Sequence, residues 1–176
     1  GDFAAVVALK CETDFVAKNA DFVALTQDIL NAAMSNKPAT KEELLKMALS
    51  DGRSIENHIT DRVGVTGEKM ELGEYEYVKG ASTVSYIHPG NKLAAIVAFN
   101  QELDHQVARE IAMQVAAMNP VAVTPADVPQ HVLDTEKQIA RDKALEAGKP
   151  ENLLDRIAEG ALQKFYKENT LLQQEY

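Results

Sequence analysis

The N-terminal third of the chain contains two regular patterns of apolar positions and one aromatic residue that fits neither. Residues 3–9 form a continuous apolar run, which predicts a well-buried strand. Phe22 and Ile29 belong to an apolar series at helical spacing that follows Asn19, a residue able to cap a helix. Phe15 lies between the two patterns. A bulky apolar side chain at such a junction is typical of an anchor that enters a partner's pocket.

The strand-and-helix pattern occurs a second time. Residues 93–99 resemble residues 3–9, and residues 116–118 repeat the Ala-Ala-Met of residues 32–34. The segment between strand and helix is six residues longer in the first copy, where it contains residues 13–18. We therefore predict two related units and a functional role for the additional residues, with chance similarity of two Ala-rich and Val-rich segments as the alternative.

Two helices are predicted between these units. Thr40 and Glu43 have capping-box spacing and open the first helix, which we expect to extend through Ala48. Ser54 caps the second helix, and Gly64 is expected to end it. The inward face of the second helix is formed by Ile55, Ile59 and Val63.

Three further strands follow in the sequence. Gly73 interrupts the alternation of the first of them, which predicts a β-bulge. Pro89 and Gly90 fit the centre of a type II turn and join the other two as an antiparallel hairpin. The predicted strands span residues 68–79, 82–87 and 92–99.

The last third of the chain has only helical patterns. One helix ends at Asn119, because the following proline disfavours helical geometry in the residue before it. Its apolar stripe consists of Val107, Ile111, Val115 and Met118. Two long amphipathic helices follow, joined by the turn at residues 148–150, and so short a turn requires an antiparallel arrangement. Their inward positions are Val132, Ile139, Ala140 and Ala144, then Leu153, Leu154, Ile157, Ala161 and Phe165.

These elements predict an α+β fold with two related antiparallel-sheet-plus-helix subdomains and a projecting antiparallel helical hairpin. We expect the first subdomain at residues 1–80, an incomplete second subdomain at residues 81–123, and the hairpin at residues 124–170. Three heptads or fewer in each arm make the hairpin a marginal coiled coil.

Composition narrows the class of partner and the compartment. The net charge of −9 argues against nucleic acid, since phosphate binding needs clustered Lys and Arg. A single cysteine, Cys11, leaves no internal disulfide and is typical of a reducing compartment. No apolar run approaches the ~20 residues that span a bilayer, so we expect a cytoplasmic protein with no membrane partner. Gly1 almost directly precedes a strand, which suggests a trimmed chain.

The sequence shows no pattern of residues that predicts an active site. The four histidines are scattered; His58 and Asp61, three apart on a helix, are a solvated contact or, less simply, a metal pair. Cys11 has no activating base nearby in the sequence. The glycines at 64 and 67 lack the lysine of a phosphate-binding loop. We expect a protein that is not an enzyme and that uses no cofactor or metal.

Each candidate partner-binding residue also has a purely structural explanation. Asp14 and Phe15 fit a helix cap and an ordinary core aromatic. Val63 and Gly64 fit a last core position and a helix stop, and Gln114 fits a surface amide. The residues alone leave these alternatives open.

Several ordered segments resemble the elongation factor Ts family. Residues 11–19, Cys-Glu-Thr-Asp-Phe-Val-Ala-Lys-Asn, are similar to the family signature. Residues 111–120, the turn at 148–150 and residues 157–160 are similar to further family segments in the same order. The resemblance extends more loosely from residue 1 to about Gln174.

The resemblance implies a guanine-nucleotide exchange factor for elongation factor Tu in translation elongation. In that family the Asp-Phe pair, here Asp14 and Phe15, wedges into the G domain and disturbs the Mg²⁺ and phosphate sites. Gln114 stands where well-known members have a histidine, and its amide can keep a polar contact. The partner-binding residues that the resemblance implies are Thr13, Asp14, Phe15, Val16, Val63, Gly64 and Gln114.

The resemblance also implies segments that this sequence lacks, namely a small N-terminal helical domain and a C-terminal strand and helix. We therefore expect an open sheet edge in the second subdomain, a homodimer as a second assembly, and weak nucleotide exchange. The alternative is a non-catalytic interaction or dimerisation module for another partner, in which Phe15 would be buried. A small-molecule enzyme would instead need a concave pocket with convergent polar groups.

Overall fold

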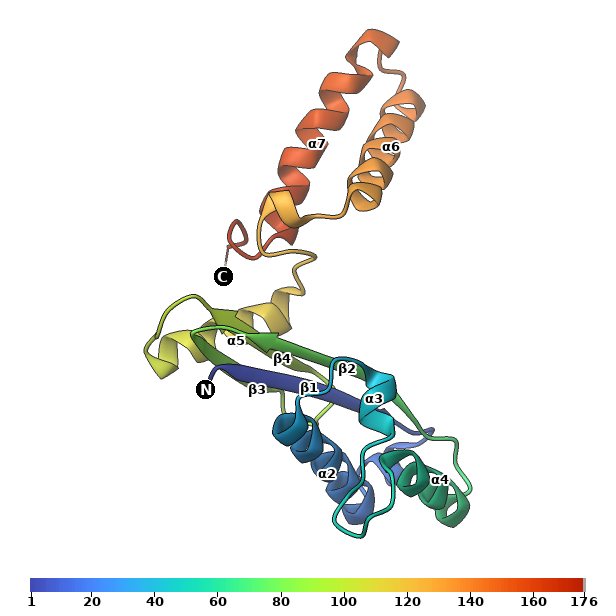
Figure 1. Cartoon of the computed structure of the whole chain (residues 1–176). Helices are drawn as coiled ribbons and strands as arrows, with labels where there is room; N and C mark the ends of the chain where they lie inside the picture. The colour runs from blue at the N-terminus through green and yellow to red at the C-terminus, as the bar shows by residue number, and fades with distance from the viewer. Residues whose placement is uncertain (176) are drawn as a thin grey trace. The chain divides into compact units, whose positions relative to one another are not determined.

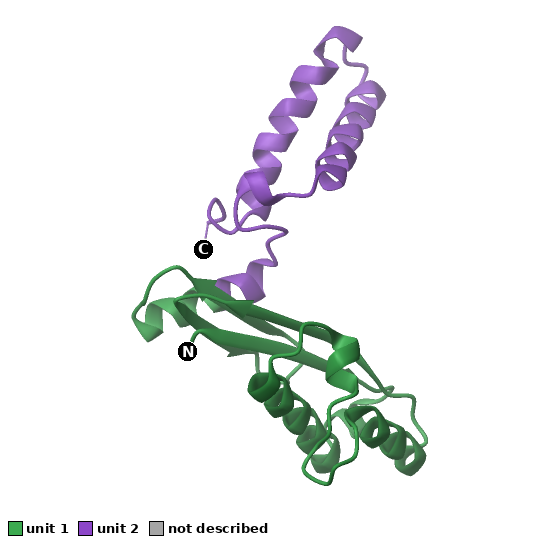
Figure 2. Cartoon of the chain, in the orientation of Figure 1, with its two compact units in different colours: residues 1–112 green, residues 113–176 purple. Residues whose placement is uncertain are grey.

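The computed structural model describes residues 1–175 and divides the chain into two compact units, residues 1–112 and 113–176 (Figure 2). Both antiparallel sheets lie in the first unit, and long helices dominate the second (Figure 1). The α+β class expected from the sequence is therefore correct. The division into three subdomains at residues 80 and 123 stays a prediction.

The first unit contains four strands and four helices, followed by the beginning of a fifth helix. They are β1 (Phe3–Lys10), α1 (Asp14–Ala17), α2 (Ala20–Asn36), α3 (Lys41–Leu45), α4 (Ile55–Thr66), β2 (Glu71–Lys79), β3 (Ser82–Ile87), β4 (Ala94–Phe99) and α5 (His105–Met118). The strands form two antiparallel pairs, β1 with β2 and β3 with β4.

The β1–β2 pair contains the predicted bulge. Ala8 pairs with Glu74 and Leu9 pairs with Leu72, which leaves Gly73 as the extra residue on β2. A Cβ atom at Gly73 would collide with the side chain of Lys10 on the neighbouring strand. A larger residue at this position would require the flexible lysine side chain to move.

The hairpin from β3 to β4 has the turn that the sequence predicts. The Asn91 amide donates to the His88 carbonyl at 3.0 Å, and Gly90, at the third position, has a φ of 97°. These are the features of a type II turn, in which the third residue needs positive φ. Val84 pairs with Val97 at the centre of the hairpin.

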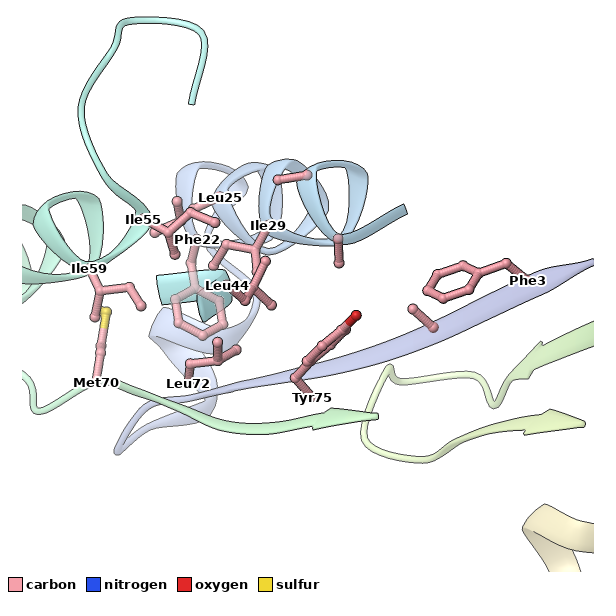
Figure 3. Packing of buried hydrophobic residues seen from close by; sticks show 13 residues of the cluster. Phe3, Phe22, Leu25, Ile29, Leu44, Ile55, Ile59, Met70, Leu72 and Tyr75 are labelled. Atoms are coloured by element: carbon pink, nitrogen blue, oxygen red, sulfur yellow. The ribbon is translucent and has the colours of Figure 1, made fainter. Parts of the chain in front are cut away.

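The core of the first unit lies between the β1–β2 pair and the helices α2, α3 and α4 (Figure 3). Ile29, Leu44 and Ile55 are completely buried there, one from each helix. Burying a side chain of this size contributes about 1.5 to 3 kcal/mol relative to leaving it exposed. The helices are therefore held mainly by their apolar faces.

Two helix boundaries differ from the prediction. α3 ends at Leu45, and Ala48 instead pairs with Ser54 in a short bridge that turns the chain toward α4. α4 continues through Gly64 to Thr66, and Gly67, with a φ of 71°, ends it. Gly64 is thus not a helix stop, because the amide of Gly67 still bonds to the Val63 carbonyl at 2.9 Å.

The second unit is built on two antiparallel helices. α6 (Gln130–Glu146) and α7 (Leu154–Asn169) pack side by side, with the short 3₁₀ helices η1 (Pro125–Asp127) and η2 (Glu151–Leu153) before each (Figure 1). Gly148, at a φ of 75°, makes the turn between them. The helical hairpin is present, whereas a coiled coil stays a prediction.

Some expected inward positions of the helices are wrong. Ile139 of α6 and Leu153 of η2 are exposed, because the buried line runs through Ala144 and, on α7, through Ala158 and Leu162. The ends of the predicted α5 stripe, Val107 and Met118, are also exposed. The buried residues of α5 are Ala108 and Ala112.

Within residues 1–175, no three His, Cys, Asp or Glu side chains gather as a metal site would require. Across the same residues, no helix combines the length and the apolar character that a membrane crossing needs.

Candidate functional site

Phe15 lies on α1, a single helical turn between β1 and α2. Its side chain is 90% exposed, the highest value among the large apolar residues that are exposed. The next residue, Val16, points the other way and packs against the core of the first unit. The turn therefore presents Phe15 outside, as its misfit to the neighbouring patterns predicts. Val16, which the family resemblance places among the partner-binding residues, packs against the core instead, and its role in binding a partner stays a prediction.

Thr13 is the N-cap of α1. Its hydroxyl oxygen accepts a hydrogen bond from the Val16 amide at 3.4 Å, and its backbone is extended. Asp14, which also fitted a helix cap, is the first residue of the helix. Phe15 is thus the second residue of the turn, two positions after its N-cap.

A carboxylate from a distant part of the sequence holds this cap. Glu68 accepts the Thr13 hydroxyl at 2.6 Å and the Thr13 amide at 2.9 Å. It also accepts the amide of Glu12 at 3.1 Å. In the opposite direction, the Lys69 amide donates to the Glu12 carboxylate at 2.9 Å. We call these four residues, Glu12, Thr13, Glu68 and Lys69, the crossed clamp.

The crossed clamp joins the start of α1 to the segment that follows α4. It thereby connects the turn that carries Phe15 with the end of α4, which carries Val63 and Gly64. The sequence predicts these two segments separately as partner contacts. Val63 is half-buried against the same core as Val16, and Gly64 is exposed on the outer side of α4. Val65, which the sequence did not single out, is 73% exposed beside Gly64.

Asp14 has a partner within the first unit. Lys92, from the turn between β3 and β4, donates to the Asp14 carboxylate at 2.9 Å. This hydrogen bond, together with the lysine charge, lowers the pKa of Asp14. The Asp14 carboxylate is therefore tied to the turn between β3 and β4.

The environment of the crossed clamp also shifts two pKa values. The hydrogen bond from the Thr13 hydroxyl lowers the pKa of Glu68, so this carboxylate stays charged. Burial, and then the charge of Glu68, raises the pKa of the Cys11 thiol. Cys11 is thus held as the neutral thiol, which is a poor nucleophile.

Gln114 belongs to the second unit. Its side-chain amide nitrogen donates to the Leu171 carbonyl at 3.2 Å, and the residue is half-buried. The amide therefore ties α5 to the segment after α7. Its role in binding a partner stays a prediction.

Glu68 and Lys92 were missed by the sequence analysis because no local pattern marks them. Glu68 lies 55 positions from Thr13, and Lys92 lies 78 positions from Asp14. Both look like surface charges in the sequence. Only a signal of long-range proximity, such as covariation, could have pointed to them.

The fold and the site define a class of protein. An α+β body presents a rigidly held, exposed aromatic side chain next to a carboxylate, with a glycine and an apolar residue on a neighbouring helix. Such a surface suits the binding of another protein, because exposed aromatic anchors are typical of interface centres.

Comparisons with known proteins agree with this class. The elongation factor Ts family matches residues 12–176. A protein named elongation factor Ts from Porphyromonas gingivalis is 75% identical over 99% of this chain. Those of Azobacteroides pseudotrichonymphae and Christiangramia forsetii are 55% identical over 99% and 44% identical over 97% of the chain. The chain belongs to the elongation factor Ts family.

The chain spans less than two thirds of the length of these relatives. It covers 64% of the Porphyromonas gingivalis and Azobacteroides pseudotrichonymphae proteins and 62% of the Christiangramia forsetii protein.

Proposed function

We propose that this chain promotes the release of GDP from elongation factor Tu during translation elongation in the cytoplasm, by inserting Phe15 into the G domain. The observation that supports this most is the 90% exposure of Phe15 on a turn held by the crossed clamp. An aromatic side chain exposed at this level stabilises nothing in its own fold. Its presentation is therefore best explained by a partner.

The mechanism needs no covalent chemistry. An exchange factor must bind the nucleotide-free partner more tightly than the GDP-bound partner, and by linkage GDP then binds the complex more weakly. Insertion of Phe15 would shift elements of the G domain that hold the Mg²⁺ ion and the phosphates. Burial of one aromatic side chain contributes roughly 2 to 3 kcal/mol. That is about a hundredfold in an equilibrium, so other contacts must contribute too.

Asp14, Val63, Gly64 and Gln114 are the residues that we assign to those other contacts. Gly64 offers bare backbone on the exposed side of α4, since no atom lies within 4 Å of the place of a Cβ. The charged Asp14 adds a polar contact beside the aromatic ring. A homodimer is the second assembly that we propose for the chain.

Phe15→Ala tests the proposal. Fluorescent GDP is bound to elongation factor Tu, and its release is followed after addition of the chain at several concentrations. We expect the variant to slow release about 10- to 100-fold, from the lost burial of the ring in the partner. A matched control is Leu172→Ala, which truncates another exposed apolar side chain, in the second unit.

The outcomes separate the proposal from its alternative. Release at the full rate by Phe15→Ala would contradict the wedge. If the original chain fails to speed release at all, the proposed exchange activity is wrong and the alternative of an interaction module is favoured. Equal slowing by Leu172→Ala would show a general loss of apolar surface in place of a specific anchor.

A further inference from the structure

The turn that presents Phe15 is too short to hold its own conformation. α1 has four residues, and none of them is fully buried. The first turn of a helix is unfavourable by itself, because several backbone angles are fixed for one hydrogen bond. Without support from the rest of the unit, the ring of Phe15 would sample many directions.

Glu68 supplies that support through the Thr13 hydroxyl. The hydroxyl donates its proton to Glu68 at 2.6 Å, and this fixes its lone pairs so that one can accept the Val16 amide. The other oxygen of Glu68 accepts two consecutive amides, those of Glu12 and Thr13. The carboxylate thus fixes both the entry of the chain and the cap of the turn.

Other contacts lie at or near this place. The pair of Lys92 with Asp14 is a single hydrogen bond between two exposed side chains, which water and salt screen. Asn19 caps the helix after the turn, where it accepts the amides of Asp21 and Phe22.

Val16, packed against the core, and the Lys69 amide, bonded to Glu12, also hold the turn. Glu68 is the side chain that binds both the N-cap hydroxyl and the two amides that lead into the turn.

We infer that Glu68 is a positioning residue for Phe15, which holds the ring ready to enter a protein partner. The inference rests on the proposed function, because it assigns Glu68 a part in the same event. It adds a residue that lies outside the family signature at residues 11–19. Preorganisation of this kind reduces the ordering that binding requires.

A graded series of variants tests the inference. Glu68→Gln keeps an oxygen for the two amides but offers Thr13 a donor in place of a charged acceptor, whereas Glu68→Ala removes every contact. We expect GDP release from elongation factor Tu to slow about threefold with glutamine and about tenfold with alanine. Glu76→Ala, the same charge change on an exposed position of β2, should leave the rate unchanged.

A double-mutant cycle distinguishes positioning from general support of the fold. If Glu68 acts through the ring, Glu68→Ala has no further effect on release in a chain that already carries Phe15→Ala. A second loss of about tenfold in that background would overturn the inference, because the glutamate would then act independently of the ring.

A local measurement keeps the test independent of the partner. Amide hydrogen exchange of the chain alone should become at least about tenfold faster at Thr13 and Val16 in Glu68→Ala, while Ile29 keeps its protection. Thr13→Val, which removes the hydroxyl but keeps the shape, should speed the exchange of the Val16 amide. Unchanged exchange at these amides overturns the inference.

Failure of the proposed function and failure of the inference about Glu68 give different results. If the original chain does not speed GDP release but the amides respond to Glu68→Ala, the proposed function fails and positioning for that partner fails with it. If the original chain is active and Phe15→Ala is slow, but Glu68→Ala releases GDP at the full rate, only the inference about Glu68 fails.

Discussion

Ile29 and Phe15 show how differently two large apolar residues of the same unit are used. Ile29 is completely buried in the core, whereas Phe15 is 90% exposed. Ile29→Ala should therefore lower the free energy of unfolding by about 2 to 5 kcal/mol, through lost burial and the cavity left behind. Phe15→Ala should change it by less than about 0.5 kcal/mol. Urea unfolding of both variants checks this, and a large loss for Phe15→Ala would show that the ring supports its own fold.

The pKa of Glu68 tests whether the Thr13–Glu68 hydrogen bond of the crossed clamp forms in solution. The Thr13 hydroxyl lowers this pKa from the ordinary value of 4.5. The stability that Glu68 adds is thus fully present above the unfolded value and is lost as the pH falls through the lower, folded value. We expect the carboxyl carbon of Glu68 to titrate below pH 4.5 by NMR, and its midpoint to move upward in Thr13→Val. If the titration midpoint of Glu68 is the same in Thr13→Val as in the original chain, the hydrogen bond is absent in solution.

At the scale of elements, local signals predicted where most helices begin. Asn19, Thr40 and Ser54 each cap the helix that the sequence assigned to them. Caps are short-range, because a side chain meets an amide two or three residues later. The bulge at Gly73 and the turn at Gly90 are equally local.

Helix ends and the candidate site were harder to predict. Gly64 and Gly67 both suit a helix stop in the sequence, and only backbone geometry decides between them. The exposure of Phe15 followed from its misfit to the neighbouring patterns. The contacts that hold the turn in place could not be predicted, because Glu68 and Lys92 bond to Thr13 and Asp14 from distant segments. Contacts across 55 or 78 positions leave no periodic trace.

Gly64, inside α4, and Gly67, which ends this helix, should respond to alanine in opposite ways. Gly64 lies inside the helix with open space around it, so Gly64→Ala should stabilise the chain by about 0.5 to 1 kcal/mol. Gly67 has a φ of 71°, so Gly67→Ala should destabilise it by about 1 kcal/mol. Thermal unfolding of both variants checks this. If Gly64 contacts the partner as proposed, the more stable variant will also exchange nucleotide more slowly.

On the scale of the whole molecule, the first strand-to-helix connection, residues 11–19, is longer than the second, residues 100–104, by four residues and not by the six that the sequence predicted. The connection from β1 to α2 contains α1, whereas the connection from β4 to α5 contains no helix. The additional residues of the first connection thus form the turn that carries Phe15. This supports a functional origin for the insertion, and a common origin of the two strand-plus-helix units stays a prediction.

The proposed function predicts how GDP affects the affinity of the chain for elongation factor Tu. If the chain weakens GDP binding by some factor, GDP must weaken the binding of the chain to elongation factor Tu by the same factor. We expect the chain to bind nucleotide-free elongation factor Tu at least about tenfold more tightly than the GDP-bound form, within the usual range of coupling between two sites. Calorimetric titration of both forms measures the factor directly.

Phe15→Ala should bring the two affinities toward one another, because the ring is the contact that we assign to the nucleotide-free state. Leu172→Ala should leave their ratio unchanged. A ligand that binds two states equally shifts neither, however tightly it binds. Equal affinity of the original chain for both forms would therefore exclude nucleotide exchange and favour an interaction module, even if the complex were strong.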